Sequence, residues 1–252
     1  TLTPPEGYKI SNDGSTWKDI VTLNVEGTND VRYYLRDKDG GITDGKMVKI
    51  SIDTVAPAGE IRIKDNSFTG RLLNIVNFRY FFSRTVNVNI TGADDTSGID
   101  TIEYQKAART ADYDKDGVWI KGSSLTVDPG EKFIIYARIT DNAGHQTIIN
   151  SDGIVVYTDV AAVSEMNFIK SSRKNQDAGL TLNGNTVAEI TKDGNRLEAG
   201  NYTVINDRLV FNADYLNSLE AGKHRLEVTY NPLGETFTTG ESNGDTPQTT
   251  TI

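Results

Sequence analysis

The acidic run "DYDKDG", residues 112–117, has the residue types of a calcium-binding loop. Asp112, Asp114 and Asp116 stand at alternate positions, and a glycine stands sixth. Ca²⁺ prefers six or more oxygen ligands, and glycine allows the sharp bend of such a loop. The twelfth position, where the loop needs a bidentate glutamate, is Ser123. The run therefore has two interpretations, a Ca²⁺ site or the polar tip of a turn between two strands.

The other polar clusters do not combine into a catalytic set. "DDTSGID", residues 94–100, contains three carboxylates, and its composition favours a solvated turn. The only two histidines, His145 and His224, fall in different predicted domains. We predict no nucleophile elbow between a strand and a helix, and no module with the architecture of a catalytic cleft. The sequence therefore predicts a protein that is not an enzyme and needs no cofactor other than the candidate Ca²⁺.

Aromatic side chains offer a different chemistry, stacking on sugar rings. We regard Tyr113, Tyr202 and Tyr215 as the exposed candidates for a carbohydrate platform. The aromatic-rich stretch "LLNIVNFRYFFSRTV", residues 72–86, is interpreted as a long connection that packs over a sandwich. Aromatic residues this dense are usually buried, so Phe78, Phe81 and Phe82 are predicted to lie in the core.

Composition limits the partners of the chain. Its 252 residues carry a formal net charge of −9 and include no cysteine. An acidic surface repels phosphate backbones, so nucleic acid is not expected as a partner. No apolar run approaches the ~18 residues of a membrane helix, so no membrane insertion is expected. The lack of disulfides fits an exported bacterial protein, and it also fits a cytosolic one.

The elements that must position these residues are strands, and they recur. A shift of 104 positions places Val31, Tyr33, Leu35 and Asp37 on Ile135, Ala137, Ile139 and Asp141. Such alternation buries every second side chain of a strand, and the aspartate with its nearby glycine predicts a turn. The preceding tryptophan and the following strand also recur in the same order, which indicates an internal repeat.

The repeat predicts a domain organisation. The second copy contains about seven alternating strands, as an immunoglobulin-like sandwich does, whereas the first copy begins only with its later strands. "DTVAP", ending at Pro57, predicts a short and stiff junction. We expect an elongated, monomeric rod of tandem all-β sandwiches. Its predicted parts are the later strands of one repeat (1–55), a complete repeat (56–159), a third module (160–238) and a flexible linker (239–252).

The third module has its own pattern. "AGLTLNGNTVAEI", residues 178–190, predicts two strands around an Asn-Gly turn, and "NYTVINDRLVF", residues 201–211, predicts a hairpin that turns at Asn206 and Asp207. "DYLNSL", residues 214–219, has the spacing of one helical turn. Asn212 or Asp214 is its candidate cap, and Gly222 is its predicted end.

Two resemblances follow from these motifs. "TDNAG" (140–144), "DTSGI" (95–99) and "DTVAP" (53–57) resemble the immunoglobulin-like repeats of large Gram-positive surface proteins, over residues 8–160. "LTLNGN" (180–185), "LEAGNYTV" (197–204) and "YLNSLEAGKHRLEVTY" (215–230) resemble the X-two carbohydrate-binding module family, over residues 160–238.

The resemblances imply a function and its alternatives. They imply a spacer in a secreted or cell-surface bacterial protein, with polysaccharide or cell-wall binding by the third module. One alternative is an adhesin fragment that binds a host protein or glycan through the loops of its sandwiches. Another is an accessory region of a glycoside hydrolase.

Overall fold

The computed structural model describes residues 1–70, 72, 76–162 and 165–252. The chain is almost entirely β, with 48% of residues in strands and 6% in helices, so the predicted all-β sandwich class is confirmed. No helix in the described part is long and apolar enough to cross a membrane. The chain divides into two compact units. Unit 1 comprises Thr1–Gly59, Gly92–Ile102 and Arg138–Thr147, and unit 2 comprises Glu60–Thr91, Glu103–Ala137 and Ile148–Ile252. The four predicted domain ranges remain predictions.

The first strands form a three-stranded antiparallel sheet in unit 1. Its strands, β1 (Lys9–Ser11), β2 (Gly27–Arg36) and β3 (Lys46–Ile52), follow the order β1-β2-β3. Val31 of β2 lies opposite Val48 of β3. The side chains of β2 stay half-buried or exposed, so this sheet has a thin core in which Ile10 and Val21 are buried.

The strands of the second predicted repeat belong to two sheets. The first sheet has the order β10-β7-β4-β5, and the second has the order β21-β6-β13-β11-β8-β9, with β12 paired to β11. Alternate side chains of β4 and β7, such as Ile61 and Val88, are fully buried, as the period of two requires. The bounds are β4 (Ala58–Ile63), β5 (Asn66–Thr69), β6 (Phe78–Phe82), β7 (Val86–Ala93), β8 (Ile99–Ala107), β9 (Ile120–Lys121), β10 (Ser124–Val127), β11 (Glu131–Asp141), β12 (Gln146–Asn150), β13 (Gly153–Val156) and β21 (Asn243–Gly244).

The aromatic-rich stretch forms a strand where a connection was expected. β6 pairs in parallel with β13, and Phe81 lies opposite Val155. Phe81 and Phe82 are at most 1% exposed, as predicted for core residues, whereas Phe78 is half-buried. Strand β6 therefore adds to the sheet, because its backbone pairs with β13 on one side and with β21 on the other. Residues 73–75 of this stretch lie outside the described residues.

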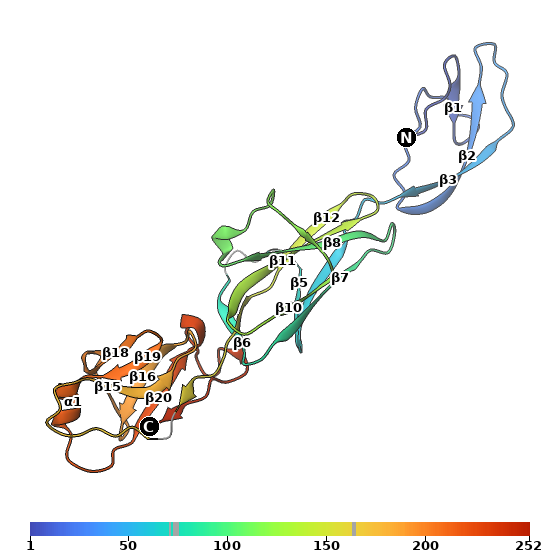
Figure 1. Ribbon diagram of the computed structural model, residues 1–252. Coiled ribbons are helices and arrows are strands. Elements are labelled where there is room, and N and C mark those ends of the chain that lie inside the picture. The colour runs from blue at the N-terminus through green and yellow to red at the C-terminus, as the bar shows by residue number, and fades with distance from the viewer. Residues whose placement is uncertain (71, 73–75, 163–164) are drawn as a thin grey trace. The chain divides into compact units, whose positions relative to one another are not determined.

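The C-terminal part of unit 2 is a second pair of sheets. The sheet orders are β14-β15-β19-β18 and β17-β16-β20-β22, drawn in the yellow-to-red part of Figure 1. Inward side chains from both sheets, including Leu180, Phe211 and Val228, form one buried cluster. The bounds are β14 (Ala161–Ala162), β15 (Gln176–Thr181), β16 (Thr186–Lys192), β17 (Asn195–Arg196), β18 (Tyr202–Ile205), β19 (Arg208–Phe211), β20 (Leu226–Asn231) and β22 (Thr250–Thr251).

Two predicted turns form, with different outcomes. Asn206 and Asp207 both have positive φ and connect β18 to β19 as an antiparallel hairpin. Asn183 and Gly184 also have positive φ, but the flanking strands β15 and β16 enter different sheets. The carboxylate of Asp207 accepts the N–H groups of Asn183 and Gly184 at 2.8 and 3.0 Å, so this turn is held by the neighbouring hairpin.

The described helices are short. The predicted helical turn is α1 (Ala213–Ser218), and Asn212 occupies its N-cap position. The helix ends before Leu219, which is extended, so Gly222 does not terminate it. Three 3₁₀ turns complete the described helices: η1 (Thr110–Asp112), η2 (Ala199–Asn201) and η3 (Pro232–Gly234).

The C-terminal segment 239–252, where a flexible linker was expected, pairs with two sheets. Asn243 lies opposite Tyr80 of β6, and Thr250 lies opposite Val228 of β20. The carboxylate of Asp245 accepts the N–H and hydroxyl of Ser83 at 2.7 and 2.9 Å. These contacts involve only parts of the segment, and the predicted flexible linker remains a prediction.

Candidate functional site

The three tyrosines proposed as a sugar platform are half-buried. Tyr202 lies opposite Phe211 on the inward side of the hairpin, and it packs against the core cluster. The ring of Tyr215 lies 6.1 Å from that of Phe211, and burial raises the pKa of its phenol. Tyr113 stacks on Tyr136 with ring centroids 4.4 Å apart. Packing has therefore turned these rings toward the core, and their role in sugar binding remains a prediction.

The acidic run at 112–116 forms a solvent-exposed loop. The carboxylate of Asp112 accepts a hydrogen bond from Arg109 Nε at 3.1 Å, and that of Asp114 accepts the N–H of Asp116 at 3.0 Å. Their oxygens are not brought together as a ligand set among the described residues. The Ca²⁺ interpretation remains a prediction, and the hydrogen bonds account for the loop as a turn.

The run at 94–100 is a turn, as its composition favoured. One carboxylate oxygen of Asp94 accepts the N–H groups of Thr96, Ser97 and Gly98 at 2.7 to 3.1 Å. These hydrogen bonds lower the pKa of Asp94, with the bond from Ser97 contributing most. A carboxylate used in this way shapes the backbone.

Residues 240–244, GESNG, do have the G-x-S-x-G spacing, although no nucleophile elbow was predicted, and Ser242 and His224 do not form a catalytic pair. Ser242 lies in a turn, where its hydroxyl accepts the N–H of Thr238 at 3.2 Å, and strand β21 follows it. A nucleophile elbow leads from a strand into a helix. His224 instead contacts the carbonyl of Glu220 through Nε2 at 2.8 Å.

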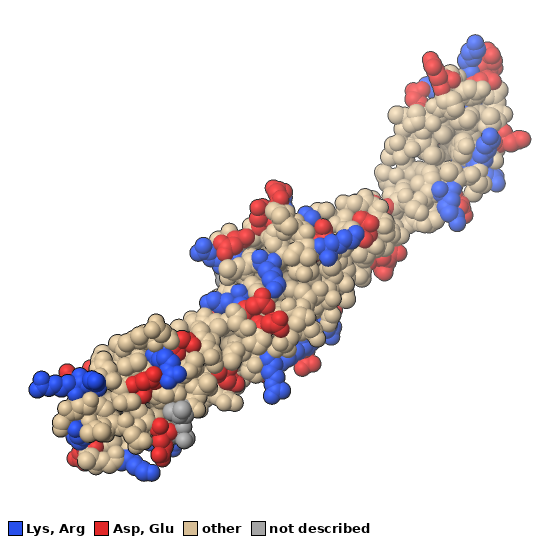
Figure 2. Space-filling view, viewed as in Figure 1, with Lys and Arg blue, Asp and Glu red and all other residues tan. Residues whose placement is uncertain are grey.

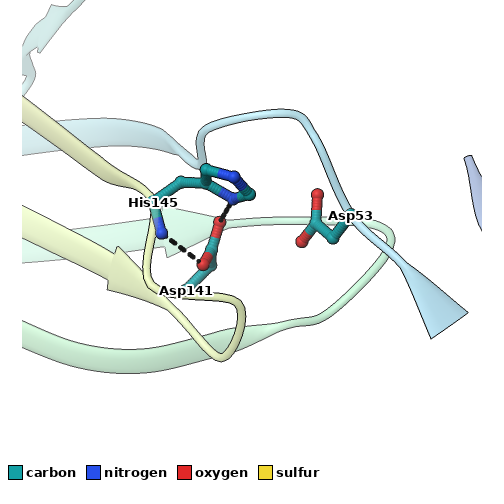
Figure 3. Close-up of side chains that lie close together, drawn as sticks. All are labelled: Asp53, Asp141 and His145. Atoms are coloured by element: carbon teal, nitrogen blue, oxygen red, sulfur yellow. Dashed lines mark hydrogen bonds and ion pairs between the residues drawn. The ribbon is translucent and has the colours of Figure 1, made fainter. Parts of the chain in front are cut away.

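A different cluster does bring ligand-type side chains together. Ligand atoms of Asp53, Asp141 and His145 all lie within 4.8 Å of one another, and this is the one such group of three found among the described residues. Figure 3 shows the two carboxylates and the imidazole at this place. All three residues belong to unit 1. Asp141 and His145 come from the turn after β11, and Asp53 follows β3.

Asp141 is positioned by the turn that it caps. It is 1% exposed, and its Oδ1 accepts the N–H groups of Ala143 and His145, both at 2.8 Å. Its Oδ2 lies 3.0 Å from His145 Nδ1. Burial alone would raise the pKa of Asp141, but these hydrogen bonds outweigh burial and leave it below its ordinary value.

Asp53 reaches the same place from the chain after β3. Its Oδ1 accepts the N–H of Val55 at 3.1 Å, whereas its Oδ2 is buried without a hydrogen-bond partner. The chain that follows Asp53 is held by two further hydrogen bonds. The Thr147 hydroxyl donates to the Pro57 carbonyl at 2.5 Å, and the Thr54 hydroxyl donates to Glu26 at 2.6 Å.

In the sequence, Asp53 was interpreted as part of the junction "DTVAP" and Asp141 as part of the turn in "TDNAG". His145 was set aside because it and His224 fall in different predicted domains. The spacing of Asp141 and His145 within one turn was a usable signal for a shared site. The approach of Asp53 was not predictable from spacing, because it depends on how two segments far apart in the sequence meet.

A second polar feature lies on the outer face of the sheet that contains β15, β19 and β18. Arg208 donates from Nε and Nη2 to the two carboxylate oxygens of Asp177 at 3.0 and 3.1 Å, and from Nη1 to Thr181 Oγ1 at 2.9 Å. The hydrogen bonds from Arg208 lower the pKa of Asp177. Ile205 lies opposite Arg208 and Thr203 opposite Val210, and both are exposed. We call Asp177, Thr181, Thr203, Ile205 and Arg208 the outer face.

Charge does not single out this sheet. In the view of Figure 2, basic and acidic side chains are intermixed over the surface and form no large patch of one sign. The outer face contains one aspartate and one arginine bonded to each other, so it is polar and locally neutral. Neutral polysaccharides are recognised by such hydrogen-bonding groups more than by net charge.

The comparisons with known proteins concern this part of the chain. Residues 162–238 match the model of the family described as Carbohydrate binding domain X2. A search of curated proteins found no match to the chain. The family match supports the predicted resemblance over the third module, and it supports carbohydrate binding in a modular protein. The resemblance of residues 8–160 to immunoglobulin-like repeats remains an expectation.

Proposed function

We propose that the chain is a non-enzymatic part of a secreted or cell-surface bacterial protein, in which residues 162–238 hold polysaccharide. The family match over these residues is the observation that supports this most directly. The sandwiches before them act as spacers between this module and other parts of the protein. The proposed localisation and spacer role rest on the resemblance of residues 8–160 to surface-protein repeats.

The outer face is the proposed sugar-binding surface. Arg208 is fixed by three hydrogen bonds, so its planar guanidinium is already ordered before a ligand arrives. Preorganised polar groups lose less conformational entropy on binding. Exposed Ile205 and Thr203 beside it supply apolar and hydroxyl contacts that suit the alternating character of a sugar ring.

The other sheet of this module offers a comparison surface. Arg196 on β17 lies near Glu189 at 3.6 Å, with the arginine side chain 75% exposed. Arg196 makes one ion-pair contact at 3.6 Å, whereas Arg208 makes three hydrogen bonds of 2.9 to 3.1 Å. An exposed pair with one long contact is less preorganised for binding, so we assign binding to the outer face.

The test uses the whole chain and insoluble glycans. Cellulose, chitin and purified bacterial cell walls are each mixed with the protein, and the bound fraction is measured after washing. We expect saturable retention on at least one of them, with release by the soluble oligosaccharide of the same glycan. Retention on none of the three would overturn the proposal.

A further inference from the structure

We propose that Asp53, Asp141 and His145 form a binding site for a divalent transition-metal cation, with Zn²⁺ as its probe. The site lies in unit 1 and is independent of the proposed carbohydrate binding. Two carboxylates and one imidazole are a mixed oxygen and nitrogen ligand set. Imidazole suits Zn²⁺ and its neighbours, whereas Ca²⁺ and Mg²⁺ prefer oxygen ligands alone.

In each carboxylate, one oxygen accepts backbone N–H groups and the other does not. Oδ1 of Asp141 accepts two backbone N–H groups, and Oδ1 of Asp53 accepts one. The other oxygen of Asp141 contacts His145 Nδ1 at 3.0 Å, and the other oxygen of Asp53 has no hydrogen-bond partner. Metal ligands are commonly oriented by hydrogen bonds of this kind, which fix the side chain while leaving the coordinating atom available.

The second carboxylate oxygen of Asp53 is the strongest sign that the cluster can bind a cation. This oxygen is buried and has no hydrogen-bond partner, although Asp53 as a whole is only partly buried. A carboxylate oxygen of Asp141, a residue that is 1% exposed, lies within 4.8 Å of a carboxylate oxygen of Asp53. A buried charged oxygen without a partner is costly, and a second carboxylate nearby raises that cost. A bound cation would satisfy this oxygen and offset the repulsion.

Access to the cluster is open on the imidazole side. The His145 side chain is 37% exposed, while that of Asp141 is fully buried. A cation can therefore reach the three ligand atoms from solvent, and water can complete its coordination. His145 Nδ1 lies 3.0 Å from Asp141 Oδ2, so these two ligand atoms lie side by side.

The turn that begins at Asp37, which also lies in unit 1, shows that a histidine is not needed to form this kind of turn. Asp37 Oδ1 accepts the N–H groups of Asp39 and Gly41 at 2.9 and 2.8 Å. Gly41 stands where His145 stands in the other turn, so the same backbone forms without a histidine. The imidazole of His145 is therefore not required by the turn, and it lies beside two carboxylates.

Isothermal titration of the metal-stripped whole chain with ZnCl₂ tests the site. We expect one saturable site, weakened more than about tenfold by Asp53→Asn and by His145→Gln, since each removes one of three ligands. Both changes leave the turn intact, because Asn keeps an acceptor for Val55 N–H and the His145 backbone N–H remains. Circular dichroism checks that each variant is folded.

Two matched variants complete the design. Asp37→Asn alters the turn that lacks a histidine, and His224→Gln removes the other imidazole, and neither should change the Zn²⁺ affinity. Three results would each overturn the proposal: no saturable Zn²⁺ binding, equal affinity in wild type and both ligand variants, or Ca²⁺ binding with the same sensitivity to these variants.

Discussion

Asp37 and Asp141 accept hydrogen bonds from the same two relative positions of the backbone that follows them. In each turn one carboxylate oxygen receives the N–H groups two and four residues ahead, at 2.8 to 2.9 Å. The aspartate carbonyl also accepts the N–H of the following turn glycine at 3.2 Å in both places. A turn of this form was expected from the aspartate and glycine spacing, and the two copies agree in atomic detail.

Removing either carboxylate should loosen its own turn. Asp141→Ala leaves the N–H groups of Ala143 and His145 without their acceptor, at a cost of about 1–3 kcal/mol to the local stability. Amide hydrogen exchange of these two groups should accelerate. Asp37→Ala should accelerate exchange at Asp39 and Gly41 instead. Unchanged exchange in both variants would show that the carboxylates do not hold the turns.

The turn at Asp141 should weaken in acid. Its folded-state pKa is lowered, so the ionised carboxylate contributes stability that is complete above the unfolded pKa of about 3.9. This contribution is lost as the pH falls from there through the lower folded-state pKa. Exchange at the Ala143 amide, corrected for intrinsic pH dependence, should therefore increase below about pH 4. Asp141→Asn should remove this dependence, and its persistence in that variant would contradict the assignment.

The C-terminal segment should depend on a small residue at Gly244. This glycine has φ +93°, and a Cβ there would lie 2.1 Å from the carbonyl oxygen of Phe81. Gly244→Ala should therefore displace the segment and release the Ser83 N–H from Asp245. Faster hydrogen exchange of the Ser83 amide measures this.

Gly240→Ala is the control for that substitution. Gly240 has a similar φ of +87°, but a Cβ there meets no atom within 4 Å. The backbone strain is alike in the two variants, so only the clash differs. Equal exchange at Ser83 in both variants would argue against the close packing of Gly244.

The hydroxyl of Tyr215 should contribute little to the stability of the fold. It is buried without a hydrogen-bond partner, while the ring packs against the core. Tyr215→Phe removes an unsatisfied polar group, so the free energy of unfolding should change by less than about 1 kcal/mol or increase. Urea denaturation followed at the third module measures this. A large loss of stability would show that the hydroxyl has a partner.

Sequence patterns predicted those parts of the fold that depend on residues close together in the chain, such as strands and hairpin turns. Alternation placed the strands around Val31, Ile61 and Val88, and positive φ at Asn206 and Asp207 gave the predicted hairpin. The same logic did not show that the strands around Asn183 enter different sheets, because the partner of β15 is chosen by core packing. The proximity of Asp53 to Asp141 could not be predicted either, because the two residues belong to segments that are far apart in the sequence. The half-burial of Tyr202 and Tyr215 was not predicted either, because sequence alone does not show which side of a ring packs against the core.

The direct test of carbohydrate binding compares two arginines on opposite sheets of the same module. Retention on the glycan that binds the wild-type chain is measured for Arg208→Ala and Arg196→Ala, after circular dichroism has shown that both are folded. Arg208 carries three hydrogen bonds on the outer face, and Arg196 carries one long contact on the other sheet. We predict that Arg208→Ala loses most of the retention and that Arg196→Ala keeps it. Full retention by Arg208→Ala, or equal loss in both variants, would contradict binding at the outer face.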